Sequence, residues 1–481
     1  MMIKNNLYKY ILAAGILFTG CKKDFLELAP ISNANVNAIY KSQQDFDLAT
    51  NAAYTSLYEV YAPKGPISFT GELLSDNTTV TTLAISGSFT IVDQQAFRDY
   101  TIFPTNTGVY NFWVTLYSAI YKNNIVLDKI AGASLSDAYK NQIIGEMKFL
   151  RGLHYFNLVQ LYGGVPLVTK PISGQEAYAM SRSTADEVYA QIISDLEDAA
   201  GLLTEPGSEP AVGRANKAAA KTLLGKVYLT KGDKAKAGTV LKEVYDSYNG
   251  SRYDLLPNYQ GLFGNSATFK NTKESIFEIQ YLGGIGNPYS TYWTVFAPFE
   301  NFTITKYGGG MNMVTDDLYN EYETSDPRRS ISISNGYTKN GVFVPIKFQN
   351  KWVDASAVAD GSLEAANNNF IVLRYADVLL MLTEATGDVQ YLNKVRSRVG
   401  LPAYGTAGYP SQYNTVALAV EHERRVEFAL EFHRWFDLKR TNRAVTVLTA
   451  KGKTVNQDKM LLPIPDYARR QNSKLSQNPG Y

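Results

Sequence analysis

The chain has 481 residues, of which 45% are hydrophobic and 19% charged, a composition typical of globular proteins and unlike that of disordered or collagen-like chains. The 47 Lys and Arg residues nearly balance the 45 Asp and Glu residues, which argues against a nucleic-acid partner, because that binding relies on basic side chains that neutralise phosphates. One cysteine excludes an intrachain disulfide, and three histidines leave few ways to build a His/Cys metal site.

Residues 1–20 have the pattern of an export signal. Lys4 and Lys9 form a basic stretch, an apolar stretch follows at residues 11–18, and Thr19 and Gly20 precede Cys21. The apolar stretch is too short to span a hydrocarbon core about 30 Å thick, and no later stretch is long and apolar enough to do so. Small residues before a cysteine at this position resemble a lipobox, in which the thiol is acylated. We therefore predict that Cys21 is a lipid anchor.

Two helices are predicted in the first half of the chain. Residues 142–162 are apolar on nearly every side of a helix, which indicates burial, and Gly163 ends the pattern. A second helix follows a capping box formed by Thr184 and Glu187, in which each side chain binds the backbone amide of the other residue. Its apolar residues recur every three or four positions and share one face: Val188, Ile192, Leu196, Ala199 and Leu203.

Residues 218–249 match much of a tetratricopeptide repeat, a helix hairpin whose small residues allow close crossing. A poorer match centres on Gly387, and Trp113 begins a fragment of a third. The matching positions of the first repeat are Leu224, Gly225, Tyr228, Gly232, Ala237 and Leu241. The sequence therefore predicts a mainly all-α fold class, a tetratricopeptide-like α superhelix with long irregular loop insertions and a few short strands.

Residues 63–112 and 250–370 form two insertions that break the helical pattern. They are rich in Gly, Ser, Thr and Asn and contain short strand-like pieces such as residues 275–281. Insertions of a repeat protein project as loops and tend to form its binding face.

Aromatic residues are concentrated within residues 287–302, at a spacing that fits neither a helix stripe nor an alternating strand. Flat rings beside Asn, Glu and Ser suit a sugar, because a ring packs on its C–H face while polar groups bind the hydroxyls. Two interpretations stay open: a sugar-binding surface, or rings that pin an irregular loop to the core. The aromatic residues are Tyr289, Tyr292, Trp293, Phe296, Phe299 and Phe302.

The usual catalytic signatures are absent. A P-loop ending at residues 452–454 would need glycine where Val447 stands, and neither G-x-S-x-G nor H-E-x-x-H occurs. His422 and His433 would share one helix face about 16 Å apart, too far for a common metal ion. These motifs therefore give no indication of an enzyme.

The densest charge cluster lies within residues 421–440. Glu427, Glu431 and Asp437 could act as acid and base groups, which makes a surface glycoside hydrolase with a carboxylate pair the alternative function. Arginines at neighbouring helical positions and apolar residues between them favour a different interpretation. We expect a partly buried ion-pair network that braces the last helices.

Taken in order, these motifs resemble the SusD/RagB family of surface nutrient-binding lipoproteins. The resemblance covers essentially the whole chain after Cys21, and the order of its pieces makes it specific. The matching segments are residues 24–30, 113–120, 123–124, 145–167, 373–380, 392–400, 423–428, 434–440, 462–465 and 477–481.

The resemblance implies a signal peptide at residues 1–20 and a single domain at 21–481, with an N-terminal part at about 21–232 and a C-terminal part at about 250–481. It implies a protein lipid-anchored on the outer face of a Gram-negative outer membrane. Such proteins bind a glycan or other oligomeric nutrient, cap a SusC-like TonB-dependent transporter and catalyse no reaction. A tetratricopeptide scaffold for periplasmic protein partners is a third alternative.

In the family, the ligand surface comes from loops after the first long helices and from mid-chain insertions. Asp76 and Asn77 match a Ser-Asp stretch that precedes a variable loop. Residues 78–100 contain no Trp, so the ligand class stays open and includes peptides. No cofactor is expected, and a calcium ion in a loop stays an open alternative. The predicted ligand-binding residues are Asp76, Asn77, Phe89, Tyr289, Tyr292, Trp293, Phe296 and Phe299.

Overall fold

The structure, a computed structural model, describes residues 40–80, 91–299, 303–361 and 363–481. The predicted signal peptide, Cys21 and Phe89 therefore lie outside the described residues. In the described ranges, no helix combines the length and the apolar character that a membrane crossing requires.

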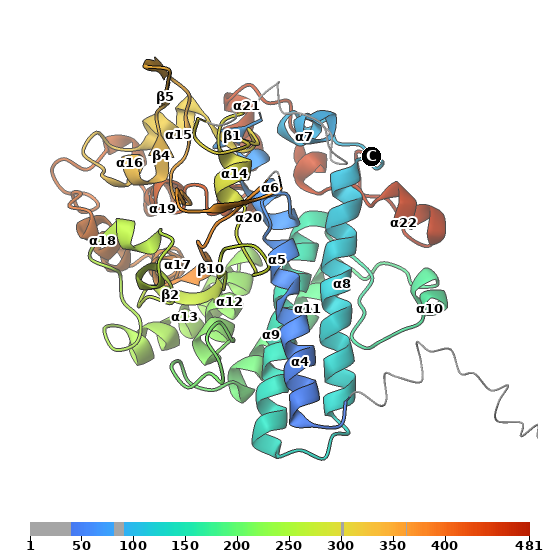
Figure 1. The fold of residues 1–481 in the computed structure, drawn as a ribbon. Helices are drawn as coiled ribbons and strands as arrows, with labels where there is room; N and C mark the ends of the chain where they lie inside the picture. Colours follow the sequence, from blue (N-terminus) through green and yellow to red (C-terminus); the bar gives the residue numbers. More distant parts are fainter. Residues whose placement is uncertain (1–39, 81–90, 300–302, 362) are drawn as a thin grey trace, which may run out of the picture.

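The N-terminal half of the described chain is a layered array of long helices, with α4, α8 and α9 side by side in Figure 1. As predicted, α9 is buried on most sides and ends at Gly163, which has a φ of 71°. The capping box of Thr184 and Glu187 begins α11. The helices are α4 (Gln43–Tyr54), α5 (Ser56–Val60), α6 (Pro66–Leu73), α7 (Ile91–Arg98), α8 (Thr107–Ile130), α9 (Asp137–Tyr162), α10 (Gly174–Tyr178) and α11 (Ala185–Leu202).

The predicted tetratricopeptide hairpins are present. Helices α12 (Lys217–Thr230) and α13 (Lys234–Tyr248) are joined through Gly232, whose φ is 82°. They cross so closely that a Cβ atom on Gly225 would lie 2.5 Å from Leu241 Cγ. The second match forms α17 (Tyr375–Thr386) and α18 (Val389–Arg398), joined through Gly387 with a φ of 79°.

The second insertion carries nearly all of the short strands, which lie on one side of the helical body in Figure 1. The described strands form five antiparallel pairs: β1 (Thr78–Thr79) with β3 (Met313–Val314), β2 (Ser275–Ile279) with β10 (Phe370–Arg374), β4 (Ile333–Ser334) with β7 (Phe348–Gln349), β5 (Tyr337–Lys339) with β6 (Val342–Val344), and β8 (Val358–Asp360) with β9 (Leu363–Ala365). Its short helices are α14 (Tyr292–Phe296), α15 (Asp316–Glu321), α16 (Arg328–Ser332), η2 (Tyr259–Leu262) and η3 (Ala267–Phe269). These pairs confirm the prediction of a mainly helical fold with few short strands.

The C-terminal region consists of short helices that return to the body. One cluster of buried apolar side chains extends from Phe46 to Leu475, so this region shares a core with the first helices. The elements are η4 (Ser411–Tyr413), α19 (Val416–Glu427), α20 (Arg434–Arg440), α21 (Ala444–Ala450), η5 (Gln457–Met460) and α22 (Asp466–Gln471).

The charge cluster at residues 421–440 does not form one helix, so the expectation that His422 and His433 share a helix face is wrong. Leu430 and Phe432 each have a φ of 67°, and the chain turns between α19 and α20. The Phe432 amide donates to a Glu72 carboxylate oxygen at 3.1 Å. Its ring stacks on Phe370 at 5.2 Å. These contacts stabilise a backbone conformation that costs a non-glycine residue about 1–2 kcal/mol.

Candidate functional site

Glu427 lies at the centre of a buried ion-pair network that joins the C-terminal helices to the second insertion. Its carboxylate contacts Arg328 at 2.7 Å, Arg374 at 2.5 Å and Arg398 at 2.5 Å. Glu431 contacts Arg374 at 2.8 Å and Lys351 at 2.6 Å. The predicted ion-pair network is confirmed, and these side chains are more deeply buried than expected.

The network keeps both carboxyl groups ionised. Burial alone would raise the pKa of Glu427, but Arg398, Arg374 and Arg328 hold the pKa well below its ordinary value. The pKa of Glu431 is also lowered, because Arg374 and Lys351 outweigh its burial. A glycosidase needs one carboxyl group that is protonated near neutral pH, and neither of these carboxylates meets that requirement.

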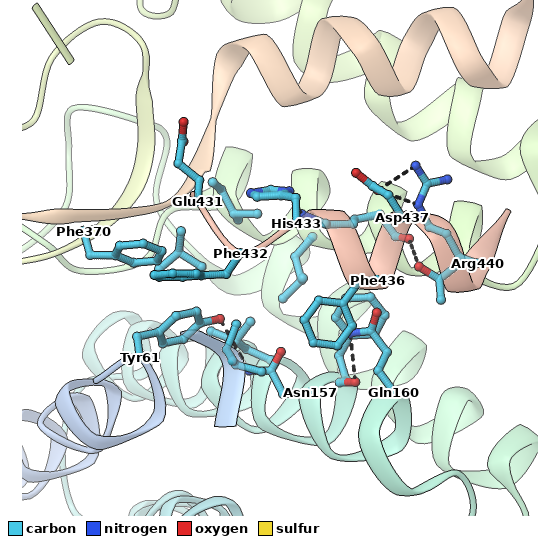
Figure 2. A pocket seen from close by; sticks show the side chains of 18 residues that line it. Tyr61, Asn157, Gln160, Phe370, Glu431, Phe432, His433, Phe436, Asp437 and Arg440 are labelled. Carbon is cyan, nitrogen blue, oxygen red and sulfur yellow. Dashed lines mark hydrogen bonds and ion pairs between the residues drawn. The ribbon is translucent and has the colours of Figure 1, made fainter. Parts of the chain in front are cut away.

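A small cavity lies beside the network between α9 and α20. Figure 2 shows Glu431, His433 and Asp437 on one wall and Tyr61 and Asn157 opposite them. Its volume is about 60 Å³, far below the roughly 300–1,000 Å³ of ligand pockets. The cavity is therefore too small for a sugar. One of the groups that line it is His433, whose pKa is lowered to about 3 by burial and by the neighbouring Lys226.

Asp76 and Asn77, both predicted to bind ligand, are buried, so the structure does not place them on an exposed binding surface. Asp76 accepts from Arg434 at 2.8 Å and contacts Arg425 at 3.0 Å. The Asn77 side chain donates to Glu72 at 2.9 Å and accepts from Arg425 at 2.9 Å. The polar groups of both side chains are engaged in contacts that attach the loop after α6 to the C-terminal helices.

The aromatic segment divides into buried and surface residues. Tyr292, Trp293 and Phe296 of α14 are 0%, 5% and 1% exposed, and the Tyr292 ring lies 4.9 Å from Trp352. Their placement in a sugar-binding surface is wrong, because these rings fill the core beneath the insertion. Tyr289 and Phe299 keep partial exposure.

A surface patch surrounds Tyr289 and joins the loop at residues 282–289 to the β8–β9 hairpin. Leu282, Ile285 and Val358 are 68%, 63% and 55% exposed. The Tyr289 hydroxyl donates to Asp360 at 3.0 Å, which fixes the ring on the hairpin. Burial and this hydrogen bond raise the pKa of Tyr289, so the phenol remains a donor. We call these five residues the loop patch.

Glycines give the loop its compact shape. The Leu282 amide donates to the Pro288 carbonyl at 2.8 Å, and the Gly284 amide donates to the Ala365 carbonyl at 3.1 Å. Gly283 has a φ of 67°, and a Cβ there would lie 2.9 Å from Asn367 Cβ. Only glycine fits this close approach with a left-handed backbone. The loop therefore holds its apolar side chains toward solvent.

A second aromatic surface lies on α8. A groove of about 320 Å³ is lined by rings from α8, α10 and α22, including Trp113 and Tyr467. Polar groups in it are already engaged with backbone: the Tyr117 hydroxyl donates to Pro166 at 2.8 Å, and the Asn472 side chain donates to Met180 at 2.7 Å. The groove thus offers ring surface but few groups for sugar hydroxyls.

Sequence reasoning missed most of the loop patch and the whole groove. Ile285 stands between Gly284 and Gly286, where an exposed apolar side chain could have been noticed. The α8 rings recur every three or four residues, which is a readable helix face. The sequence around Asp360 does not indicate its role, because its partner Tyr289 lies 71 residues away.

Two family models match the chain. A model described as starch-binding and associating with the outer membrane matches residues 24–229, and a SusD family model matches residues 301–481. A SusD-like protein of Formosa agariphila is 28% identical over 97% of this chain and 98% of its own length. The starch-binding protein SusD of Bacteroides thetaiotaomicron is 32% identical over 31% of this chain and 26% of its own length.

Solved structures share the fold. A laminarin-binding SusD-like protein is 29% identical to this chain, with a TM-score of 0.78, over 92% of this chain and 100% of its own.

Proposed function

Because the chain belongs to the SusD family, we propose that it binds an oligosaccharide at the cell surface and delivers it to a TonB-dependent outer-membrane transporter. The family description, starch-binding and associating with the outer membrane, supports this proposal. So does the similarity over nearly the whole chain to a protein that binds laminarin.

We place the sugar on the loop patch. The observation that carries this placement is the Tyr289 ring, partly exposed and held by Asp360 among exposed apolar side chains. A sugar can stack on the ring while Asp360 accepts from a hydroxyl. Phe299 is partly exposed and stays a proposed contact; Phe89 stays a prediction outside the described residues.

The patch is tested by affinity electrophoresis of the mature protein in gels that contain single polysaccharides. We expect at least one polysaccharide to retard the protein and Tyr289→Ala to abolish that retardation. Tyr467→Ala in the aromatic groove is the matched control and should migrate like the wild type. Loss of retardation in the control, with Tyr289→Ala unaffected, would move the sugar to the groove.

We propose that the protein catalyses no hydrolysis, because its densest carboxylate cluster is neutralised by buried cations. Incubation with the polysaccharides that bind should release no reducing ends. Release in proportion to protein concentration would instead support the glycoside hydrolase.

Delivery requires a partner and an anchor. Pull-down of the native protein from detergent-solubilised membranes should retrieve a large outer-membrane barrel protein. Protease treatment of intact cells should cleave the chain, which distinguishes a surface protein from a periplasmic scaffold. Recovery of the chain alone, or its full protection in intact cells, would contradict this part of the proposal.

A further inference from the structure

The loop patch lies in a part of the chain that lacks basic residues. Residues 282–299 contain no Lys, Arg, Asp or Glu, although the chain has 47 basic and 45 acidic residues. Residues 356–367 contain only Asp360 and Glu364 as charged residues. Any charge that the patch presents is therefore negative.

Two lysines border the patch, and both are engaged. The Lys270 ammonium donates to the Tyr281 carbonyl at 2.5 Å and to the Asn367 side chain at 2.6 Å. The Lys306 ammonium lies 5.5 Å from the centroid of the Tyr307 ring. Within the described ranges, neither ammonium group forms an ion pair with Asp360 or Glu364.

The β8–β9 hairpin carries two carboxylates, Asp360 in the loop patch and Glu364 beside it. Asp360 accepts from the Tyr289 hydroxyl, and Glu364 accepts from the Lys306 amide at 3.0 Å. Among the residues that the structure describes, neither carboxylate forms an ion pair, whereas Asp76 and Glu427 each meet two or more guanidinium groups. The second oxygen of Glu364 is buried and has no hydrogen-bond partner. The loop patch itself therefore presents one carboxylate, Asp360, and no basic group.

A carboxylate without a neighbouring basic group favours uncharged glycans over anionic ones. Sulfate and uronate groups are bound in proteins by Arg and Lys, which match their charge and geometry. An anionic sugar next to Asp360 would meet a like charge, which is costly at a partly desolvated surface. Hydroxyl groups of an uncharged sugar can instead donate to a carboxylate in charge-assisted hydrogen bonds.

We propose that the loop patch binds an uncharged oligosaccharide and discriminates against sulfated and uronic-acid glycans. This inference rests on the proposed function and narrows its substrate class. Asp360 is its specificity-determining residue, since it both orients Tyr289 and supplies the negative charge.

The test measures binding of the mature protein to two sets of oligosaccharides, neutral (gluco-, manno-, xylo- and arabino-oligosaccharides) and anionic (oligouronates and sulfated oligosaccharides), by calorimetry at low and physiological salt. We expect a neutral member to bind at least about tenfold more tightly than any anionic one. Asp360→Asn keeps an acceptor for Tyr289 and should narrow that ratio by improving anionic binding. Asp316→Asn removes a carboxylate from α15, whose side chain is 81% exposed, and should leave the ratio unchanged.

The outcomes separate this inference from the proposed function. If an anionic glycan binds more tightly than every neutral one, and Tyr289→Ala weakens that binding, the inference is overturned while the proposed function stands. If the affinity for a neutral oligosaccharide is unchanged by both Tyr289→Ala and Asp360→Asn, the inference is also overturned, because the ligand would lie elsewhere. Failure of every oligosaccharide to bind would overturn both.

Discussion

Glu427 illustrates how surroundings decide the role of a residue. In isolation, a glutamate four positions from Glu431 suits acid–base chemistry. In the structure it is buried with three guanidinium groups that come from α16, β10 and α18. Each of the three arginines also forms an ion pair with a second carboxylate, either Asp326 or Glu274. The group is therefore a junction between elements rather than a catalyst.

We predict that Glu427→Gln lowers the free energy of unfolding by about 3–5 kcal/mol, the usual cost of removing one partner from a buried ionic cluster. Urea unfolding followed by circular dichroism measures this change. Asp246→Asn, in an exposed pair with Lys242, is the control and should change the unfolding free energy far less. Equal effects of the two substitutions would contradict the assigned role.

His422 is a buried residue whose charge state should affect stability. Its Nδ1 atom lies 2.8 Å from Glu321 and its Nε2 atom 3.7 Å from Glu323. Its ring stacks on Tyr413 at 3.9 Å. Burial lowers the pKa of His422, but the contacts with Glu321 and Glu323 raise it by more, so the pKa lies above its ordinary value.

We predict that His422 stabilises the fold at low pH. A raised folded-state pKa gives stability that is fully present below the unfolded-state pKa of about 6.5 and is lost as the pH rises through the folded-state value. The difference in unfolding free energy between wild type and His422→Gln should therefore shrink as the pH increases above about 6.5. Parallel pH profiles for the two proteins would show that the imidazolium contributes nothing.

At the scale of elements, helices with a clear local pattern could be predicted. The spacing of Val188, Ile192 and Leu196 identified the buried face of α11, and Gly225 identified the crossing of α12 and α13. These features depend on neighbours within a few residues. The turn between α19 and α20 could not be predicted, because neither Gly nor Pro marks it and Glu72, which holds Phe432, lies 360 residues away.

The aromatic segment shows the limit of local pattern in a loop. Tyr289 and Trp293 belong to one irregular run, yet only Tyr289 keeps its surface position. Trp293 lies in α14, a helix too short to show a helical period in the sequence. The residues that cover Trp293 come from distant parts of the chain. Trp293 packs with Met313, Phe348 and Ala366. Burial here depends on tertiary contacts that composition does not encode.

We therefore predict that Trp293→Ala destabilises the protein by about 3–5 kcal/mol, the usual cost of truncating a buried large aromatic residue. Thermal or urea unfolding measures the loss. Tyr289→Ala removes a partly exposed ring and should leave the unfolding free energy nearly unchanged while it weakens glycan binding. A Trp293→Ala protein of wild-type stability that fails to bind glycan would restore Trp293 to the ligand surface.

At the scale of the whole molecule, the helical body and the second insertion share the main core, and ion pairs join them. Arg425 links Asp76 near the start of the chain to Asp317 in the insertion. Arg434 links the same Asp76 to the C-terminal region at 2.8 Å. These ion pairs fix the insertion that carries the loop patch to the helical body at Asp317, and such a fixed support would favour the proposed binding.

At the scale of the whole chain, we predict that membrane attachment depends on one residue, Cys21. The described helices offer no membrane span, and Cys21 is the only cysteine. If acylation of Cys21 provides the anchor, two or more acyl chains are needed for stable attachment, since each buried CH₂ contributes about 0.8 kcal/mol and a single chain binds only reversibly.

We predict that Cys21→Ala moves the protein from the membrane fraction to the aqueous fraction and abolishes incorporation of labelled fatty acid. Fractionation after an alkaline carbonate wash measures this, because the wash removes proteins held only by protein contacts. The Tyr289→Ala protein, with Cys21 intact, is the control and should stay with the membranes. Cys21→Ala protein that resists the wash would mean that another part of the chain anchors it, and the transporter complex would then have to be sought without assuming a lipid tether.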